Sequence, residues 1–554
     1  MAWLVNLADL FERVADAVPE RLALAHGVDG PTRTWAELEA RANALSRHLA
    51  RTCAPGDKVA IYAHNRPEHV EAIVAAMKAR LVPVNVNYRY REEELAYLLD
   101  NADAAAVVYE ATFGPRLAAL RERLPKLRAF VEIPDGSEGT PFADPYEAIA
   151  SERAPRPDVA RSPDDLILLY TGGTTGMPKG VMWPHGALWR ALGGGGNALR
   201  GEPPSEGWEQ HLARVRRPES ALRLLPGCPL MHGTGQFMAY TVLGNGGAVV
   251  TADGRSLDPH ALWRTVEARG VNVLAIVGDA FAKPMLRALE ERPGAYDLAC
   301  VRAIVSSGVL WSPAVKEALL AQLPEDAALQ DSFGSSEAVG FGVEITTRAT
   351  TTRLGRFRIG PHCKVFTPEG EEVTPGSGVA GFVARSGPIP LGYYKDEAKT
   401  AETFRVLQGR RWSIPGDWST VNPDGTLELL GRGSVCINTG GEKVHPEEVE
   451  EALKLHPAVA DAVVVGLPDE TWGEAVTGVV ELHAGHAWDE DALRAFVRER
   501  LAAYKVPKRI ALVDSVGRSP SGKADYKGAR AKAIAALGLA GGAAGARVAA
   551  PPHG

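Results

Sequence analysis

The stretch Thr171-Gly-Gly-Thr-Thr-Gly-Met-Pro-Lys-Gly180 directly follows the apolar run Asp165-Leu-Ile-Leu-Leu-Tyr170 and governs the interpretation of the whole chain. A short apolar run next to turn residues predicts a buried strand, so the Gly/Thr-rich stretch is expected to be a loop at its carboxyl end. Glycines let the backbone approach phosphate oxygens, and threonine hydroxyls can donate to them. Lys179 adds a compact positive charge. The pattern predicts a phosphate-binding loop; a Gly/Thr-rich turn without a ligand is the alternative.

Two better-known glycine motifs do not apply to this chain. A Walker A loop needs Gly-Lys-Ser/Thr, whereas Pro178 precedes the lysine here and Gly180 follows it. The segment Gly376-Ser-Gly-Val-Ala-Gly381 satisfies G-x-G-x-x-G, but no helix pattern follows it. We therefore expect a hairpin turn there rather than a dinucleotide site.

Outside the loop, helical and strand patterns alternate along the chain. Alternation of this kind predicts an α/β architecture with largely buried sheets. The supporting segments are a helix with apolar Leu7, Leu10, Phe11, Val14 and Val18 stopped by Pro19, a capping box of Thr34 and Glu37, the strands 59–62 and 271–277, and a helix over 259–269.

Three segments suggest how the chain is divided. Residues 193–220 begin with four glycines and continue through charged, Pro-rich sequence, so we expect a mobile surface excursion. The Gly-Arg-Gly-Ser stretch that begins at Gly431 indicates a domain boundary near 431–436. Residues 538–554 are almost wholly Gly, Ala and Pro, which predicts a disordered tail.

Composition excludes several classes of protein. The chain has 554 residues, of which 45% are hydrophobic and 23% charged, as in a globular enzyme of more than one domain. A formal net charge of -7 argues against a nucleic-acid binder. The 5 scattered cysteines predict neither a disulfide framework nor a zinc site. We see no signal peptide and no apolar stretch long enough to span a membrane, so a cytoplasmic location is expected.

The loop resembles the signature of the adenylate-forming superfamily, which comprises acyl-CoA synthetases, luciferases and the adenylation domains of peptide synthetases. The resemblance extends from residue 5 to about residue 530. It implies that the loop binds ATP through Thr171, Gly172, Gly173, Thr174, Thr175, Gly176 and Lys179.

The segment Asp331-Ser-Phe-Gly-Ser-Ser-Glu337 resembles the superfamily's aromatic-Gly-x-Thr-Glu element. The resemblance implies that Glu337 holds Mg²⁺ on the triphosphate and that Ser336, where relatives usually carry Thr, bonds the α-phosphate or the acyl carbonyl. The nucleotide would also contact Asp331, Ser332, Phe333, Gly334 and Ser335. Taken alone, a glutamate after Gly-Ser-Ser is more often part of a solvated turn.

Three shorter elements complete the implied nucleotide site. Ser306-Ser-Gly308 resembles the segment that packs against adenine. Pro415-Gly-Asp417 resembles the element whose aspartate binds the ribose hydroxyls, which suits a charged acceptor. In Gly431-Arg432 the arginine would be a second nucleotide contact. As isolated pieces, these would be ordinary turns.

The C-terminal region supplies the remaining expected groups. Arg518-Ser-Pro-Ser-Gly-Lys523 resembles the loop with the superfamily's catalytic lysine, so Lys523 would reach the reacting carboxylate and the α-phosphate. Gly440-Gly-Glu-Lys-Val-His-Pro-Glu-Glu-Val-Glu450 resembles the loop that walls the pantetheine channel, which makes Gly440, Gly441 and Glu442 candidates for binding coenzyme A. We expect Pro446 to begin a helix. The hinge position is Ser434, where relatives commonly carry Asp or Lys.

The acyl pocket is expected to contain His232, Gly278, Asp279 and Gly308. A satisfied core histidine is the competing interpretation of His232. Asp279 could face a polar group of the acid or cap a helix, and we favour the cap. The surrounding residues 277–281 and 308–310 are largely apolar, which favours a hydrophobic acid.

The resemblance therefore implies an AMP-forming acyl-CoA ligase that uses ATP, Mg²⁺ and coenzyme A. Its fold would be a large domain of α/β subdomains with buried sheets (residues 1–432), a small mobile α+β domain (433–537) and the tail (538–554). Segments such as Gly180-Val-Met-Trp183 and Lys523-Ala-Asp-Tyr526 are most similar to bacterial ligases for fatty acids and steroid side-chain carboxylates. The partners would be small molecules only, and the oligomeric state stays open, a homodimer included.

Other functions stay open at this point. An acyl-AMP ligase would form the adenylate but transfer nothing to coenzyme A. An amino-acid adenylation enzyme would need an acid near His232 to meet the substrate ammonium, and we see none. A luciferase shares the motifs. A non-catalytic acyl or nucleotide binder would have no need of Lys179, Glu337 and Lys523 together.

Overall fold

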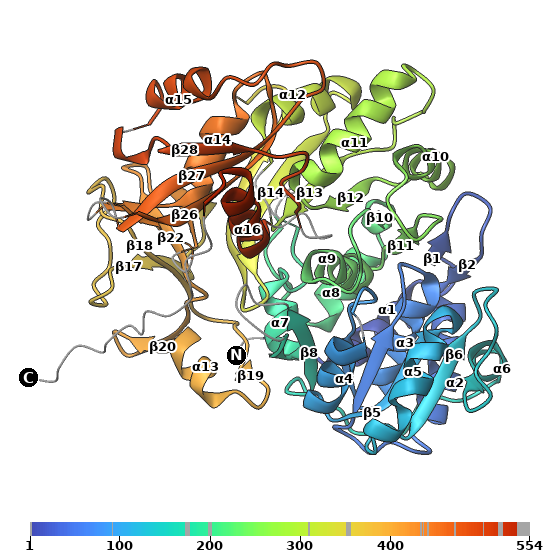
Figure 1. The fold of residues 1–554 in the computed structure, drawn as a ribbon. Coiled ribbons are helices and arrows are strands. Elements are labelled where there is room, and N and C mark those ends of the chain that lie inside the picture. Colours follow the sequence, from blue (N-terminus) through green and yellow to red (C-terminus); the bar gives the residue numbers. More distant parts are fainter. Residues whose placement is uncertain are drawn as a thin grey trace, which may run out of the picture. The chain divides into compact units, whose positions relative to one another are not determined.

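The chain folds into two compact units in the computed structural model (Figure 1). The first comprises residues 1–415 and 420–428, and the second residues 416–419 and 429–554. The structure describes residues 3–90, 92–171, 178–197, 202–308, 311–350, 356–432, 435, 437–439, 442–469, 473–501, 503–518 and 524–539. The division predicted from the sequence, after Arg432 and again after residue 537, stays a prediction.

Among the described residues, one sheet of the first unit has eight strands in the order β19-β9-β8-β4-β3-β5-β6-β7. The strands from β8 to β7 in this order run parallel, whereas β9 and β19 are antiparallel to their neighbours. Every residue of β4 and β5 is buried, as in sheets covered on both faces. The strands are β3 (Lys58–Tyr62), β4 (Val82–Asn85), β5 (Ala104–Glu110), β6 (Ala129–Ile133), β7 (Asp144–Pro145), β8 (Leu166–Thr171), β9 (Lys179–Pro184) and β19 (Gly392–Tyr393).

Two of the helices that connect or cover this sheet were predicted from the sequence, α1 and α2. The capping box at the start of α2 is confirmed: the Thr34 side chain accepts a hydrogen bond from the backbone N–H of Glu37, and the Glu37 carboxylate accepts one from that of Thr34. Helix α1 ends at Ala17, just before Pro19. These helices are α1 (Leu7–Ala17), α2 (Trp35–Leu49), α3 (Pro67–Lys78), α4 (Glu92–Asn101), α5 (Gly114–Leu120) and α6 (Tyr146–Ala150).

A larger sheet has a parallel centre in the order β1-β11-β10-β12-β13-β14 and continues antiparallel through β15 and β16. Its strands are β1 (Leu22–His26), β2 (Thr32–Thr34), β10 (Arg223–Pro226), β11 (Ala248–Thr251), β12 (Val273–Ile276), β13 (Ala303–Ser307), β14 (Ala328–Ser335), β15 (Ala338–Thr346), β16 (Arg356–Ile359), β17 (Cys363–Phe366), β18 (Gly381–Arg385), β20 (Phe404–Leu407), β21 (Arg410–Ser413), β22 (Asp417–Val421) and β23 (Leu427–Arg432). Together with the largely parallel eight-stranded sheet, this confirms the predicted α/β class.

Further helices of the first unit include the predicted one at 259–269. They are α7 (His185–Ala191), α8 (Trp208–Val215), α9 (Gly233–Gly244), α10 (Pro259–Arg269), α11 (Gly278–Glu291), α12 (Pro313–Gln322) and α13 (Glu397–Thr403). The segment 376–381 forms the expected turn before β18, with Gly376 and Gly378 at positive φ. Glycine is required there because other residues rarely adopt this conformation.

The prediction of a mobile excursion at 193–220 is wrong for its described part. Helix α8 packs against the core: His211 is fully buried and its Nε2 lies 2.9 Å from the carbonyl oxygen of Gly244. The Arg214 guanidinium donates to the carbonyls of Gly195 and Pro203. Two of the polar groups that suggested a solvated loop, the His211 ring and the Arg214 guanidinium, are thus satisfied by backbone carbonyls inside the fold.

The second unit is an α+β fold, as predicted. Its sheet has the order β25-β24-β27-β26, with β28 parallel to β27. Helix α14 begins with Pro446 at its first turn, again as predicted. The elements are β24 (Ile437–Thr439), β25 (Glu442–Val444), α14 (Pro446–Lys454), β26 (Val459–Asp469), β27 (Gly473–Leu482), α15 (Glu490–Arg498), β28 (Arg509–Leu512) and α16 (Tyr526–Ala536).

Two further observations concern the described residues as a whole. No helix among them is both long enough and apolar enough to cross a membrane. Cys53, Cys228, Cys300 and Cys363 are free thiols, as the scattered spacing predicts, and Cys436 lies outside the described residues. Most of the predicted disordered tail also lies outside them.

Candidate active site

The Gly/Thr-rich loop joins two antiparallel strands of the smaller sheet. Thr171 at the end of β8 pairs with Lys179 at the start of β9, so the intervening residues span the end of a hairpin. The base of the hairpin is tightly packed, because a Cβ on Gly180 would lie 2.7 Å from the Tyr170 ring. Asn85 of β4 bonds both backbone groups of Tyr170. Gly172, Gly173, Thr174, Thr175 and Gly176 lie outside the described residues.

The side chain of Lys179 forms an ion pair with Asp396. Its Nζ lies 2.5 Å from Asp396 Oδ2, while the other oxygen of the same carboxylate accepts from the Lys399 backbone and caps α13. The hydrogen bonds from Lys179 and from the Lys399 backbone hold the pKa of Asp396 below its ordinary value. A positive charge is thereby held at the hairpin base, at the carboxyl end of β8.

The segment 331–337 forms the end of β14 and the turn behind it. Phe333 is buried between the rings of Phe341 and Phe357, whose centroids lie 5.0 and 5.2 Å away. Gly334 approaches its neighbour closely, since a Cβ there would be 3.0 Å from the Gly340 nitrogen. Ser335 Oγ accepts from the backbone N–H of Glu337 at 3.2 Å, and Ser332 Oγ accepts from Gln330.

A fully buried lysine faces the start of this segment. Lys316 of α12 pairs with Asp331 and, at 2.9 Å, with Glu344, which is the cross-strand partner of Asp331 in β15. Burial raises the pKa of Asp331 to about 6, although the nearby Lys316 opposes the shift. Sequence reasoning missed Lys316, because a lone lysine on a helix gives no signal for burial.

The end of the segment is fixed to two strands that are not its neighbours in the sheet, β9 and β21. The Trp183 indole of β9 donates to the Ser336 carbonyl at 2.8 Å, and the Ser413 hydroxyl donates to the Glu337 carbonyl at 2.7 Å. Glu337 is 9% exposed, and its Oε1 accepts from the Tyr393 hydroxyl at 2.7 Å. Lys179 Nζ lies 5.9 Å from the centre of the Tyr393 ring. The predicted residues Lys179 and Glu337 therefore flank one tyrosine that the sequence analysis did not single out.

These residues suit a site for Mg²⁺ on a polyphosphate. The described residues contain no cluster of three or more His, Cys, Asp or Glu that could enclose a metal ion. Mg²⁺ commonly uses one or two carboxylates and takes its other ligands from substrate phosphates and water. Glu337, with one oxygen held by Tyr393, fits this pattern.

The expected adenine and acyl segments come together at the ends of β12 and β13. Ser306 is fully buried and its Oγ accepts from the backbone N–H of Gly278 at 2.9 Å. Gly308 has a φ of 90°, and a Cβ on it would lie 3.9 Å from a Val277 methyl. Asp279 accepts from both the backbone and the hydroxyl of Ser312. The Asp279 carboxylate thus bonds the residue that precedes α12 and ties α11 to the start of that helix, whereas α11 itself has no side-chain cap.

His232 lies beside the hairpin base. It is the last residue before α9, and the carbonyl of the preceding Met231 accepts from Asn85, the residue that holds Tyr170. His232 is half-buried. One asparagine thus holds the backbone just before the expected pocket residue and just before the expected phosphate loop.

Comparison with known proteins agrees with this arrangement. The family described as AMP-binding enzyme matches residues 11–394, and the AMP-binding enzyme C-terminal domain matches residues 448–523. The chain belongs to the AMP-binding enzyme family. It is 46% identical to the 3-oxocholest-4-en-26-oate–CoA ligase of Rhodococcus rhodochrous over 95% of both chains. It is 43% identical to the medium/long-chain-fatty-acid–CoA/3-oxocholest-4-en-26-oate–CoA ligase of Mycobacterium tuberculosis over 96% of both chains.

Among solved structures, ATP-bound MatB from Rhodopseudomonas palustris matches with a TM-score of 0.77 at 25% identity, covering 94% of this chain and 97% of that one. The anthranilate CoA ligase AuaEII shares the fold, with a TM-score of 0.80 at 21% identity, over 97% of this chain and 99% of that one. This AMP-binding enzyme is accordingly an acid–thiol ligase that uses ATP and coenzyme A.

The second unit of this AMP-binding enzyme carries fewer describable site residues. Asp417, the expected ribose ligand, is buried at the start of β22. Arg432 ends β23 and Glu442 begins β25, but the structure describes the backbone alone of these two. Ser434, Gly440, Gly441 and Lys523 lie outside the described residues. Their roles stay predictions.

The residues on either side of the expected lysine loop are firmly held within the second unit. The Arg518 guanidinium bonds both oxygens of Asp461, at 2.6 and 2.7 Å. On the other side, Asp525 caps α16 by accepting from the backbone N–H of Gly528. The chain therefore enters and leaves residues 519–523 at fixed points.

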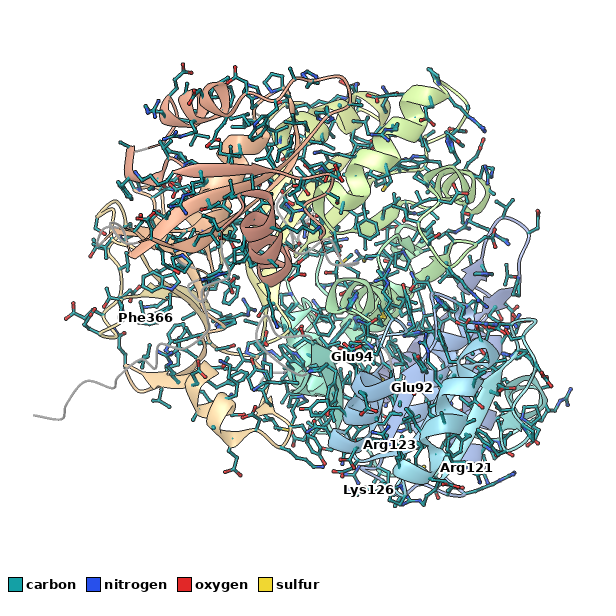
Figure 2. All side chains as sticks on the ribbon, in the orientation of Figure 1. Glu92, Glu94, Arg121, Arg123, Lys126 and Phe366 are labelled. Atoms are coloured by element: carbon teal, nitrogen blue, oxygen red, sulfur yellow. The ribbon has the colours of Figure 1, made fainter. Side chains whose placement is uncertain are left out.

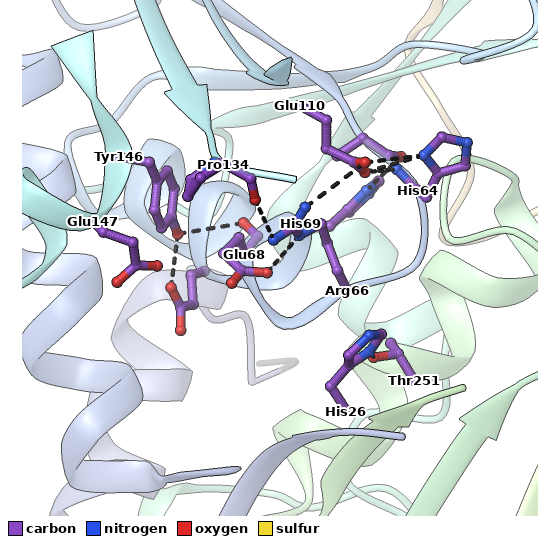
Figure 3. Close-up of polar contacts among 12 residues, drawn as sticks. His26, His64, Arg66, Glu68, His69, Glu110, Pro134, Tyr146, Glu147 and Thr251 are labelled. Carbon is purple, nitrogen blue, oxygen red and sulfur yellow. Dashed lines mark hydrogen bonds and ion pairs between the residues drawn. The ribbon is translucent and has the colours of Figure 1, made fainter. Parts of the chain in front are cut away.

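A charged cluster outside the expected site lies at the carboxyl ends of β3, β5 and β6 (Figure 3). His64 Nδ1 lies 3.2 Å from the Glu110 carboxylate, and Arg66 donates to Glu68 and to the Pro134 carbonyl. Burial raises the pKa of Glu110, but the hydrogen bonds and charge of His64 outweigh burial and hold it below its ordinary value. The charges of the cluster are compensated internally, which indicates a structural role.

An open depression of about 540 Å³ is lined by Glu92, Glu93, Glu94 and Arg116. Figure 2 labels Glu92 and Glu94 together with Arg123, which pairs with Glu93 at 2.8 Å. Three carboxylates at the rim would repel a polyphosphate, and none of the expected site residues that the structure describes lines this depression. It is therefore not the nucleotide site.

Proposed function

We propose that the chain activates the side-chain carboxylate of a 3-oxosteroid as its acyl-AMP and transfers the acyl group to coenzyme A, with medium- and long-chain fatty acids as secondary substrates. The observation that carries this proposal is that six relatives, 42–46% identical over nearly their full length, are all named for 3-oxocholest-4-en-26-oate. The apolar side chains of Val277 and Phe281 beside Gly278 are consistent with a hydrophobic acid.

The first step needs stabilisation of negative charge. A carboxylate oxygen attacks the α-phosphorus of ATP, a P–O bond forms, and the bond to the pyrophosphate oxygen breaks. Lys179 would neutralise charge on the polyphosphate from the base of the hairpin. Ser336 would donate its hydroxyl to the α-phosphate or the acyl carbonyl. Mg²⁺, held by Glu337, would neutralise charge on the phosphate oxygens when bound.

The second step replaces AMP by the thiol of coenzyme A. We propose that Lys523 serves the first step, and that a rotation at Ser434 then brings Gly440, Gly441 and Glu442 to the pantetheine. A few residues suffice to absorb the dihedral change of such a rotation. Asp417 and Arg432 would hold the ribose.

A hydroxamate assay with and without coenzyme A tests the proposal over a panel of acids. The panel is 3-oxocholest-4-en-26-oate, octanoate, palmitate and ferulate, and the products are AMP, hydroxamate and thioester. We expect the steroid acid to give the highest kcat/KM and a thioester when coenzyme A is present. A preference for ferulate would contradict the substrate class. AMP release without thioester would instead indicate an acyl-AMP ligase.

A further inference from the structure

The short strand β19 and the turn after it lie against the strand that carries Lys179. Leu391 N–H donates to the Met182 carbonyl at 2.9 Å, and Tyr394 N–H donates to the Gly180 carbonyl at 2.8 Å. Tyr393 thus pairs with Val181, two residues from Lys179. The backbone of residues 391–394 is fixed to β9 on both sides of this pair.

The turn itself is held internally. Thr400 Oγ1 accepts from the Tyr393 backbone at 2.9 Å and donates to the Asp396 carbonyl at 2.7 Å. Gly392 makes this approach possible, since a Cβ there would lie 2.4 Å from the Thr400 methyl. Tyr393 and Asp396 are therefore presented from one rigid segment, residues 392–396.

The two side chains of this segment contact the two charged groups expected to act on the polyphosphate. The Tyr393 hydroxyl donates to Oε1 of Glu337 at 2.7 Å, and Tyr393 is 6% exposed. Oδ2 of Asp396 lies 2.5 Å from Nζ of Lys179. Neither Tyr393 nor Asp396 belongs to the motifs that point to catalysis.

We propose that Tyr393 and Asp396 are positioning residues for the adenylation step, Tyr393 for the Glu337 carboxylate and Asp396 for the Lys179 ammonium. This inference rests on the proposed roles of Glu337 and Lys179. A carboxylate that accepts a hydrogen bond on one oxygen can turn its other oxygen to the metal without losing its orientation. An ammonium group has three donors, so Lys179 can keep its bond to Asp396 and donate the others to phosphate oxygens.

Asp396 is suited to this task because its position does not depend on the lysine. Its second oxygen caps α13, and the low pKa noted above keeps it ionised at neutral pH. Asparagine caps a helix about as well as aspartate, so Asp396→Asn removes the charge while it keeps the cap. Tyr393→Phe removes the hydroxyl and leaves the buried ring.

The test compares these variants in the two half-reactions. Adenylation is followed as acid-dependent pyrophosphate exchange, and thiolation as the conversion of pre-formed acyl-AMP to thioester. Tyr393→Phe is expected to lower adenylation about tenfold and to raise the half-saturating Mg²⁺ concentration, since hydrogen bonds to charged groups are worth about this factor. Asp396→Asn is expected to raise the KM for ATP about tenfold at unchanged Mg²⁺ dependence. Thiolation should stay unchanged in both.

Tyr394→Phe is the matched control, because the neighbouring hydroxyl donates to Asp103 at 2.8 Å instead. It should leave both half-reactions unchanged, and thermal unfolding should confirm that all variants are folded. If Glu337→Gln and Lys179→Ala lose adenylation while Tyr393→Phe and Asp396→Asn keep it, the positioning roles are wrong and the proposed function stands. If Glu337→Gln and Lys179→Ala also keep adenylation, the proposed site itself is wrong.

Discussion

Replacing Lys316 with methionine should destabilise the protein in a way that depends on pH. The lysine side chain is 1% exposed and is the counter-ion of two carboxylates, Asp331 and Glu344, which face each other across β14 and β15. At an effective dielectric constant of about 20, two charges 2.9 Å apart attract by about 6 kcal/mol. Desolvation offsets much of that attraction. Removing one member of such a buried group costs about 3–5 kcal/mol, because the others are left uncompensated.

The pH dependence follows from the Asp331 carboxyl. The pKa of Asp331 is raised from an ordinary 3.8 to about 6 in the folded protein. The contribution of Asp331 to the free energy of unfolding is therefore complete below pH 3.8 and is lost as the pH rises through about 6. Without Lys316 that pKa should rise further, because the attraction that opposes the shift is gone. Above pH 6 the free energy of unfolding of the variant should therefore keep falling by about 1.4 kcal/mol per pH unit. Ionisation of Asp331 no longer changes the free energy of unfolding of the parent protein in that range.

The measurement is the midpoint of thermal unfolding between pH 5.5 and pH 8. The difference between parent and Lys316→Met should widen as the pH rises. The double variant Lys316→Met/Glu344→Gln removes one of the two facing carboxylates and should recover part of the loss. If the two unfolding midpoints differ by the same amount at pH 5.5 and at pH 8, the electrostatic explanation is refuted. The destabilisation would then be due to lost packing alone.

Three further predictions concern catalysis and acid stability. Lys523→Ala should slow adenylation about 10²-fold, which corresponds to about 3 kcal/mol in the activation free energy. This is the typical effect of removing one positioned donor that stabilises charge in the transition state. A loss of less than tenfold in the hydroxamate assay would contradict the role of Lys523. Ser434→Pro should spare adenylation and impair thioester formation, so equal losses in both half-reactions would exclude a hinge there. His69 is buried and burial lowers its pKa to about 4, so its contribution to stability is complete above pH 6.5 and is lost as the pH falls towards 4. The unfolding midpoint of His69→Gln should therefore fall less steeply over pH 6.5–4, and parallel profiles would show that His69 does not cause the acid loss.

The loop and the segments around it could be predicted because the residues that define them are consecutive in the sequence. The strand 165–170 and the Gly/Thr run predicted the end of β8, and the apolar spacing around Leu7 predicted α1. Patterns of this kind depend on local backbone preferences and on one buried face, both visible in a short window.

The groups that support the site were not predictable in the same way. Tyr393 bonds Glu337 and Asp396 bonds Lys179 because β19 pairs with β9 across more than 200 residues of chain. Lys316 is buried because Asp331 and Glu344 meet across two strands and need a cation. Each contact depends on strand register, which no local pattern of a single sequence reveals. The burial of α8 within residues 193–220 was missed for a related reason. His211 bonds the carbonyl of Gly244, 33 residues further along the chain, whereas Arg214 bonds carbonyls within the segment itself.

Strand β9 explains how these distant pieces meet. Side chains alternate along a strand, so Lys179, Val181 and Trp183 share one face, and Lys179 and Trp183 bond Asp396 and the Ser336 carbonyl from it. On the other face, Gly180 lies opposite Tyr170, whose ring leaves no room for a Cβ. A shift of one residue would place a lysine or a valine against that ring and turn Lys179 and Trp183 to the opposite face. The glycine after Lys179 therefore fixes the register that brings the ammonium to Asp396 and the indole to the 331–337 segment.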